Sequence, residues 1–313
     1  MVCAMSELLR NLRPAQIRLI AAIAEHGQLQ VAATACRMTQ PGASRMLAEL
    51  ERAIGARLFQ RTPKGMEPTP TGALLAQHAR RIEHDLRRMA EDFDDLHSGL
   101  GGTVRVGAVT GPALGQLVPQ VQRLKALSSS VDISIEVAPS VALVQALERG
   151  ELDFALARLP PQVNERDFIL EPARDEIVQL LVREGHPKLG RSPVAIADLH
   201  GTRWILQQRG APIRAAIETA FHDEGMTSPP DVITTSSLLA IIALLKDSDA
   251  VAPMSQEVID LMLEPPVSAE LRRLQLNRLL TVEPYLIIQA RGRHISKAAE
   301  RLLGMVQESI RSF

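Results

Sequence analysis

At 313 residues, the chain is too long for one ordinary hydrophobic core, and its length predicts a small domain joined to a larger, two-lobed one. A hydrophobic share of 46% and a charged share of 23% are typical of a globular protein. No apolar run approaches the ~18 residues of a membrane span, and no secretory signal opens the sequence, so we expect a cytoplasmic protein with no membrane partner.

The net charge of −1 hides an uneven distribution along the chain. Residues 1–88 carry 13 Lys and Arg against 7 Asp and Glu, whereas residues 89–313 carry 22 against 29. A contact with nucleic acid is therefore expected in the basic N-terminal part. The two cysteines, Cys3 and Cys36, have no metal-ligand spacing and are interpreted as unlinked thiols of a reducing compartment.

Three short helices are predicted in the N-terminal part. The first covers residues 13–25 and ends at Gly27, and the second covers residues 29–36. The third begins after Thr39, a favourable N-cap, with Pro41 in its first turn. Its inward-facing residues are Ala43, Met46, Leu47, Leu50 and Ile54. This arrangement turns Gln40, Ser44 and Arg45 towards solvent near the N-terminal end, from which a recognition helix reads bases.

Three amphipathic helices also occur in bundles that bind no DNA, so the next segment matters. Residues 56–72, ARLFQRTPKGMEPTPTG, place the apolar anchors Leu58 and Phe59 before a hairpin rich in Pro and Gly. The hairpin can present Arg61, Thr62 and Lys64 to phosphates. Together, the helices and the hairpin predict a winged helix-turn-helix.

Three segments of this module are distinctive: AATACRMTQPGASRMLAELE at residues 32–51, IGARLFQR at 54–61 and PTPTG at 68–72. Their resemblance to the LysR-type transcriptional regulators is close. It implies that side chains of the third helix contact the major groove and that Arg61 and Lys64 hold the DNA backbone. Members often begin the second helix with Ser or Thr, where this chain has Gln28 and Gln30. The predicted DNA-binding residues are Gln30, Thr39, Gln40, Pro41, Ser44, Arg45, Arg61, Thr62 and Lys64.

A long helix with a heptad seam is predicted after Thr71, which can cap it. Its apolar residues recur at intervals of four and three: Leu75, Ala79, Ile82, Leu86, Met89, Phe93 and Leu96. Such a seam indicates coiled-coil pairing and hence a homodimer. Charge changes from positive to negative along the helix, which favours an antiparallel partner. The alternative is that the seam packs on the chain's own C-terminal domain. Glycines at 99, 101 and 102 then mark a hinge.

From residue 103 onward, predicted strands alternate with helices. This alternation indicates βαβ units around mostly parallel sheets in two lobes. We expect the first lobe at about 103–173 and 282–313, and the second at about 174–281. The chain would cross between the lobes near 171–175 and 281–284.

The C-terminal region also resembles the LysR-type effector domain, whose fold is that of periplasmic solute-binding proteins. The matching motifs are GTVRVG at 102–107, LERGELDFAL at 147–156 and REGHP at 183–187. In such sheets, ligands bind beyond the carboxyl ends of the strands, near helix N-termini. The predicted effector-binding residues at these positions are Thr110, Gly111, Ser140, Arg158, Gln207, Thr235 and Ser236.

Hydroxyls, helix ends and one guanidinium suit a small carboxylate or another anion. Each hydroxyl has an alternative role as an ordinary helix cap. Arg158 could instead pair with a surface carboxylate, and both interpretations of this residue stay open.

Two other classes of function compete with a regulator. An enzyme would need catalytic or nucleotide-binding motifs, and the chain has no G-x-G-x-x-G, P-loop, H-E-x-x-H or G-x-S-x-G sequence. We predict no catalytic residue, metal ligand or cofactor. A transport solute-binding protein would explain the lobes but not the winged helix. We therefore predict a LysR-type regulator, a dimer or tetramer that binds double-stranded DNA and responds to a small-molecule effector between its lobes. Its domains are predicted at 8–70 (DNA-binding), 71–98 (linker helix) and 103–313 (effector-binding).

Overall fold

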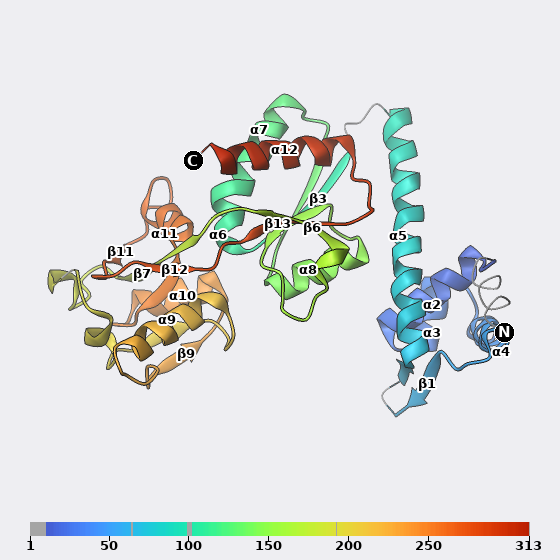
Figure 1. The fold of residues 1–313 in the computed structure, drawn as a ribbon, viewed down its shortest axis with the longest axis horizontal. Coiled ribbons are helices and arrows are strands. Elements are labelled where there is room, and N and C mark those ends of the chain that lie inside the picture. Colours follow the sequence, from blue (N-terminus) through green and yellow to red (C-terminus); the bar gives the residue numbers. More distant parts are fainter. Residues whose placement is uncertain (1–10, 64, 99–101, 192, 313) are drawn as a thin grey trace. The chain divides into compact units, whose positions relative to one another are not determined.

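The computed structural model describes residues 11–63, 65–98, 102–191 and 193–312 (Figure 1). Contacts divide the chain into two compact units, Met1–Gly102 with Gln145–Leu152 and Thr103–Val144 with Asp153–Phe313. Cys3, Lys64, Gly99 and Gly101 lie outside the described residues, as does the side chain of Leu96. Within the described ranges, no helix is both long enough and apolar enough to cross a membrane.

The N-terminal unit contains the three predicted helices and the predicted hairpin. Its elements are α2 (Pro14–His26), α3 (Leu29–Ala35), α4 (Gln40–Ile54), β1 (Phe59–Thr62), β2 (Gly65–Pro68) and α5 (Pro70–Ser98). Gly27 ends α2 in the left-handed conformation, with φ of 64°. Ile20 and Ile23 of α2 are fully buried in a core that α3, α4 and the first turns of α5 complete. The prediction of a winged helix-turn-helix is confirmed.

The junction between the hairpin and α5 corrects one prediction. Thr69, not Thr71, caps α5, because its Oγ1 accepts a hydrogen bond from the Gly72 amide at 3.1 Å. The same hydroxyl donates to the Arg57 carbonyl at 2.8 Å. A Cβ on Gly72 would lie 1.8 Å from the Leu58 carbonyl oxygen, so only glycine fits there. The helix therefore starts closer to the hairpin than the sequence suggested.

The first lobe of the C-terminal domain is a five-stranded sheet with the order β4-β3-β5-β13-β6. The strands are β3 (Thr103–Ala108), β4 (Asp132–Val137), β5 (Phe154–Ala157), β6 (Phe168–Pro172) and β13 (Leu286–Ala290). β3 pairs in parallel with β4 and β5, as predicted, whereas β13 runs antiparallel to β5 and β6. The strand β6, preceded by the 3-10 turn at Glu165–Asp167, was not predicted.

Helices flank this sheet. They are α6 (Thr110–Pro112), the π-helical Ala113–Leu117, α7 (Val118–Leu127), α8 (Ser140–Arg149) and α12 (Lys297–Arg311). α7 and α12 lie together over one face (Figure 1), where Leu124 and Leu302 are fully buried. α8 connects β4 to β5. The helical stretch after β3 therefore begins at Thr110 and contains a π-helical segment before α7.

The second lobe is built around one long strand, β7 (Glu176–Arg183). Three strands pair with it: β10 (Ala252–Ser255), β11 (Leu271–Leu274) and β12 (Leu280–Val282). All three pairings are antiparallel, so the expectation of a mostly parallel sheet is wrong for this lobe. The run of apolar residues in β7 reflects burial on both faces, which a central antiparallel strand shares with parallel strands. The parallel pair in this lobe is β8 (Trp204–Leu206) with β9 (Val232–Thr234).

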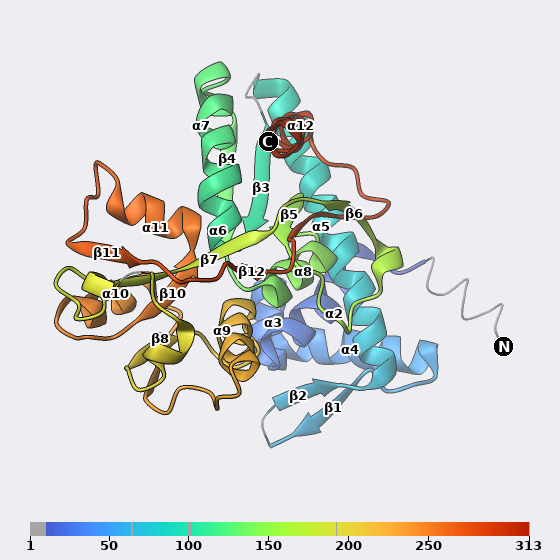
Figure 2. The ribbon, with the colours of Figure 1, turned by 60° about the vertical axis from the view of Figure 1, so that its left-hand side comes forward.

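Helices cover both faces of the β7 sheet. They are α9 (Pro212–Asp223), α10 (Leu238–Lys246) and α11 (Gln256–Leu263), with 3-10 turns at Leu189–Arg191 and Ile196–Leu199. α9 and α11 lie on opposite sides of β7 (Figure 2). The side chain of Trp204 is fully buried against Phe221 of α9, with ring centroids 5.5 Å apart.

Two segments connect the lobes, and they are bonded to each other. Residues 173–175 lead from β6 to β7, and residues 283–285 lead from β12 to β13. The Ala173 amide donates to the Tyr285 carbonyl, and the Tyr285 amide donates to the Arg174 carbonyl, both at 3.1 Å. These crossings lie near the predicted 171–175 and 281–284. They bring residues more than 100 positions apart into one hinge.

Candidate DNA-binding and effector sites

The N-terminal end of α4 presents most of the predicted DNA-reading residues. Thr39 caps the helix, because its side chain accepts a hydrogen bond from the Gly42 amide at 3.3 Å. Ala43 and Leu47 are buried on the inner side of α4. The residues on the outer side are Gln40, Pro41 and Arg45, which are exposed, and Ser44, which is half-exposed. Apolar periodicity thus fixes the orientation of the helix and leaves its polar residues available to a ligand.

At the start of α3, a glutamine occupies the N-cap position and does not cap the helix. Gln28 occupies the N-cap position in extended conformation, and its side chain makes no capping hydrogen bond. Gln30 is exposed, and its carbonyl accepts a hydrogen bond from the Thr34 hydroxyl at 3.1 Å. The side chain of Gln30 therefore lies on the surface. The first N–H groups of α3 receive no hydrogen-bond acceptor from the side chain of Gln28.

The β1–β2 hairpin is tied to the helices by its backbone. The Met66 amide donates to the Gly27 carbonyl at 2.6 Å, and Gly65 adopts φ of 131° at the same point. Arg61 is exposed on β1. Thr62 contributes to the hairpin itself, because its hydroxyl lies 3.3 Å from both the Gly65 carbonyl and a Glu67 carboxylate oxygen. Lys64 lies outside the described residues, so its contact with the DNA backbone stays a prediction.

The heptad seam of α5 divides into two parts. Ala79 is buried and Leu75 is half-buried against the core of the N-terminal unit. The next four apolar side chains are 38–59% exposed: Ile82, Leu86, Met89 and Phe93. A stripe of large apolar groups at a spacing of three and four residues is unusual on a solvated helix.

The predicted effector residues of the first lobe gather around the ends of β3 and β5. The Ser140 hydroxyl accepts a hydrogen bond from the Arg158 amide at 3.1 Å. Thr110 is exposed at the start of α6. Gly111 is buried, and a Cβ there would lie 2.6 Å from Glu176 Oε1 and 2.8 Å from Ser255 Oγ. Gly111 therefore lies against the second lobe, and a side chain at this position would force Glu176 and Ser255 to shift.

Arg158 forms an ion pair, but a buried one. Its Nη2 lies 2.7 Å from a carboxylate oxygen of Glu176, the first residue of β7, and the two side chains are 15% and 6% exposed. Its Nε donates to the Glu283 carbonyl at 2.8 Å. The residue thus reaches from the first lobe to the second lobe and to one crossing segment. Sequence reasoning missed Glu176, because nothing in a buried apolar strand marks its first residue as the partner of an arginine 18 positions earlier.

The predicted residues of the second lobe lie where β8 and β9 end. Gln207 is half-buried, and its carbonyl accepts a hydrogen bond from Arg214 Nη1 at 3.0 Å. The Thr235 hydroxyl accepts from the Ser237 amide at 3.1 Å, and Ser236 is exposed. Arg214 was not predicted, although it is 6% exposed and paired with Glu218 at 2.8 Å. Its spacing of four residues from Glu218 in a predicted helix was the available signal.

The region around the lobe crossings also contains buried polar atoms for which the described residues supply no hydrogen-bond partner. Ser255 is 2% exposed, and its hydroxyl has no hydrogen-bond partner among the described residues. One carboxylate oxygen of Glu257 is in the same situation. Burial, followed by the nearby Glu257 carboxylate, raises the pKa of Tyr285 to about 12. The phenol in the second crossing therefore stays neutral at physiological pH.

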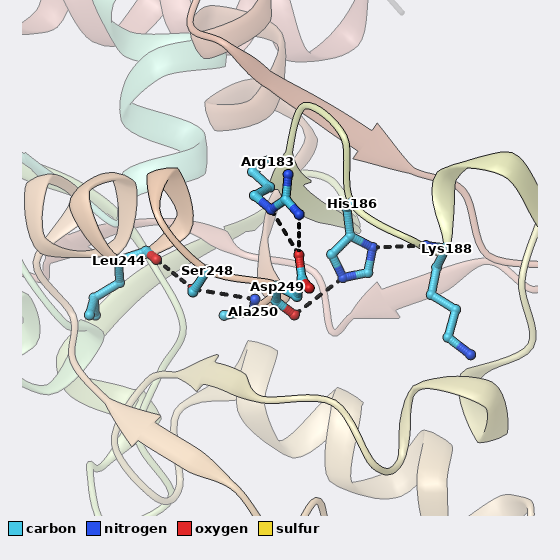
Figure 3. A network of polar contacts seen from close by, with 7 residues as sticks. All are labelled: Arg183, His186, Lys188, Leu244, Ser248, Asp249 and Ala250. Atoms are coloured by element: carbon cyan, nitrogen blue, oxygen red, sulfur yellow. Dashed lines mark hydrogen bonds and ion pairs between the residues drawn. The ribbon is translucent and has the colours of Figure 1, made fainter.

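The REGHP motif forms a network of its own at the other end of β8 and β9 (Figure 3). His186 Nδ1 accepts a hydrogen bond from the Lys188 amide at 3.2 Å, so Nε2 carries the proton and donates to the Asp249 carbonyl at 3.2 Å. Arg183 pairs with the Asp249 carboxylate at 2.7 Å. Burial lowers the pKa of His186. These contacts fasten the end of β7 to the segment before β10, beside a cavity of about 360 Å³ that Lys188, Arg203 and Asp231 help to line.

Comparisons with known proteins agree with this architecture. A family model described as "Bacterial regulatory helix-turn-helix protein, lysR family" matches residues 14–73, and one described as "LysR substrate binding domain" matches residues 97–311. The HTH-type transcriptional regulator GbpR of Rhizobium radiobacter is 36% identical over 78% of this chain and 82% of its own length. GbpR of Azospirillum brasilense is 32% identical over 95% of this chain and 86% of its own length.

Solved structures show the same fold at lower identity. Full-length CbnR complexed with its target DNA superposes with a TM-score of 0.65 at 20% identity, over 95% of this chain and 100% of that one. A full-length OxyR variant from Pseudomonas aeruginosa gives 0.64 at 22% identity, over 96% and 95%. The resemblance found in the sequence motifs is thereby confirmed. The chain belongs to the LysR family and is a transcriptional regulator with an N-terminal DNA-binding helix-turn-helix and a C-terminal effector-binding domain.

Proposed function

We propose that this regulator binds an inverted-repeat operator as a dimer, with α4 of each copy in the major groove of one half-site. The observation that carries the proposal is the exposed N-terminal end of α4, where Gln40, Pro41 and Arg45 lie opposite the buried face of the helix. A recognition helix reads base edges from this end. Arg61 and Lys64 of the hairpin would neutralise phosphates beside it.

The exposed stripe on α5 supports the dimer. Four large apolar side chains with coiled-coil spacing would be buried by the same stripe of a second copy. A symmetric pair of DNA-binding units matches the symmetry of an inverted repeat. Contacts between effector-binding domains would extend the dimer to a tetramer.

We place the effector between the two lobes, at the ends of β3, β5, β8 and β9. Hydroxyls and guanidinium groups of both lobes lie at these strand ends, and this chemistry suits a small organic anion. The regulator would act in the cytoplasm and catalyse no reaction. Its regions are proposed as 8–70 for DNA binding, 71–98 for pairing and 103–313 for the effector.

Fluorescence anisotropy on the DNA upstream of the protein's own gene tests the proposal. We expect tight, salt-sensitive binding to this DNA, weaker binding to a scrambled sequence of equal length, and a change in affinity with one member of a panel of organic acids. Equal affinity for both DNAs at every salt concentration would reject operator recognition. Specific binding that no panel member alters would reject the anionic effector.

A further inference from the structure

The contacts of Arg158 with Glu176 and Glu283 suggest more than a structural tie. The guanidinium uses Nε for the Glu283 carbonyl and Nη2 for Glu176. No partner of Nη1 is found among the described residues. A carboxylate binds a guanidinium best through two parallel hydrogen bonds from neighbouring nitrogens. Nη1 and Nη2 form such an edge, and Glu176 uses half of it.

Glu176 lies among the residues predicted to bind the effector. Its other carboxylate oxygen faces Gly111. The backbone amide of Arg158 donates a hydrogen bond to the Ser140 hydroxyl. Two of the predicted effector ligands, Gly111 and Arg158, therefore flank the carboxylate of a protein side chain. A third, Ser140, holds the backbone of Arg158. This carboxylate lies where the acidic group of an anionic ligand was expected.

We propose that Glu176 is a built-in counterion that occupies Arg158 in the effector-free protein, and that a carboxylate of the effector displaces it. The proposal rests on the proposed function and names the acidic group as the feature that the site recognises. The incoming carboxylate first binds Nη1 and then replaces Glu176 at Nη2. Arg158 is therefore paired with one carboxylate before and after the exchange. Effector binding is thereby coupled to the loss of one contact between the lobes.

The position of the pair explains how this loss reaches the hinge. Glu176 follows the crossing at 173–175 directly, and Glu283 opens the crossing at 283–285. Arg158 holds both crossings to the end of β5. When Glu176 is released, the first crossing loses one of its ties to the first lobe, while the bond of Arg174 to the Ile310 carbonyl remains. The angle between the lobes can then change about the remaining contacts. Glu176 is thus a positioning residue that opposes the effector-bound arrangement.

The test uses Glu176→Gln in the full-length protein without any effector. Glutamine keeps the shape and one acceptor but removes the charge that holds Arg158. We expect a changed bend of the upstream DNA, measured by fluorescence resonance energy transfer between its ends. We also expect faster amide exchange at 173–176 and 283–285. Asp231→Asn is the matched control, because Asp231 forms an exposed ion pair with Arg203 at 2.9 Å in the second lobe. It should change neither measurement.

A ligand titration forms the second arm. Benzoate, succinate and gluconate are titrated against wild type, Glu176→Gln and Arg158→Gln, each acid beside its amide. At least one acid should bind Glu176→Gln about 5- to 150-fold more tightly than wild type and lose its binding to Arg158→Gln, with no gain for the amide. Wild-type-like DNA bending in Glu176→Gln overturns the proposal. So does the absence of tighter acid binding.

Two checks separate the possible failures. Thermal unfolding of each variant shows whether it folds, and Arg158→Lys, which keeps the charge but not the fork, should fold and still bind the acids more weakly than wild type. An Arg158→Lys variant that binds the acids as tightly as wild type would show that the paired hydrogen bonds of the guanidinium are not required. If wild type itself fails to prefer its upstream DNA, the proposed function fails. If it prefers that DNA and Glu176→Gln behaves identically, the counterion alone is wrong.

Discussion

The DNA-binding module and the effector-binding domain build their sites in opposite ways. The module takes its candidate DNA-contacting residues from one continuous stretch, 30–64, and the described ones are exposed or half-exposed. The effector domain joins Arg158 and Glu176 to Glu283, which lies more than 100 positions later in the sequence, and buries Arg158 and Glu176 against each other. Substitutions in the module should therefore change binding with little loss of stability. Substitutions in the effector domain should alter stability and coupling together.

The largest effect is expected from the stripe on α5. Met89→Asp combined with Phe93→Asp places carboxylates in the apolar seam, so the protein should become monomeric. Operator affinity should then fall by about 100-fold or more, because the second half-site no longer benefits from linkage to the first. Sedimentation equilibrium and anisotropy measure the two quantities. Asp85→Asn, on the same helix outside the seam, should leave both unchanged. A doubly substituted protein that stays dimeric would show that pairing depends on other surfaces.

Next comes base recognition by α4. Arg45→Ala should weaken binding to the upstream DNA by about 10- to 100-fold while leaving binding to scrambled DNA nearly unchanged, because a base contact carries sequence information. The matched control is Arg52→Ala, an exposed arginine in the last turn of the same helix. Equal losses on both DNAs would assign Arg45 to the phosphate backbone instead.

A smaller effect is expected from the hairpin. Lys64→Ala should reduce affinity for both DNAs equally and lower the slope of log affinity against log salt by about 1, as the loss of one phosphate contact requires. Arg45→Ala should not change this slope. An unchanged slope in Lys64→Ala would remove this lysine from the interface. Arg45→Ala should also unfold at the wild-type temperature, because the side chain of Arg45 is exposed.

The smallest effect concerns the buried His186. Its pKa is lowered by burial, so at acidic pH the unfolded chain binds a proton that the folded protein does not. Above about pH 6.5, protonation of His186 does not change the free energy of unfolding. Below that pH, it makes this free energy decrease by at most about 1.4 kcal/mol per pH unit. Urea unfolding between pH 7 and 5 should show a weaker pH dependence for His186→Gln. His294→Gln, at a histidine outside this network, should follow wild type. A steeper dependence in His186→Gln would contradict this sign.

Local sequence determined the module almost completely. The Thr39 cap, the glycine at 27 and the apolar spacing of α4 act within a few residues, so the predicted helices and hairpin form where the sequence placed them. The cap at Thr69 was misassigned to Thr71 because the choice depends on the hydrogen bond of Thr69 to the Arg57 carbonyl, which spans 12 positions. Neighbouring residues alone could not distinguish two threonines separated by one proline.

The effector domain shows what only tertiary structure decided. Apolar runs located most of its strands, but not that β7 would be paired antiparallel, since burial on both faces gives the same pattern in either direction. The sequence also pointed to Arg158 as a functional cation. The sequence could not identify its partner, because a buried charge pairs with whichever counterion lies near it in the folded chain. Folding places a carboxylate oxygen of Glu176 of the second lobe 2.7 Å from Arg158 Nη2.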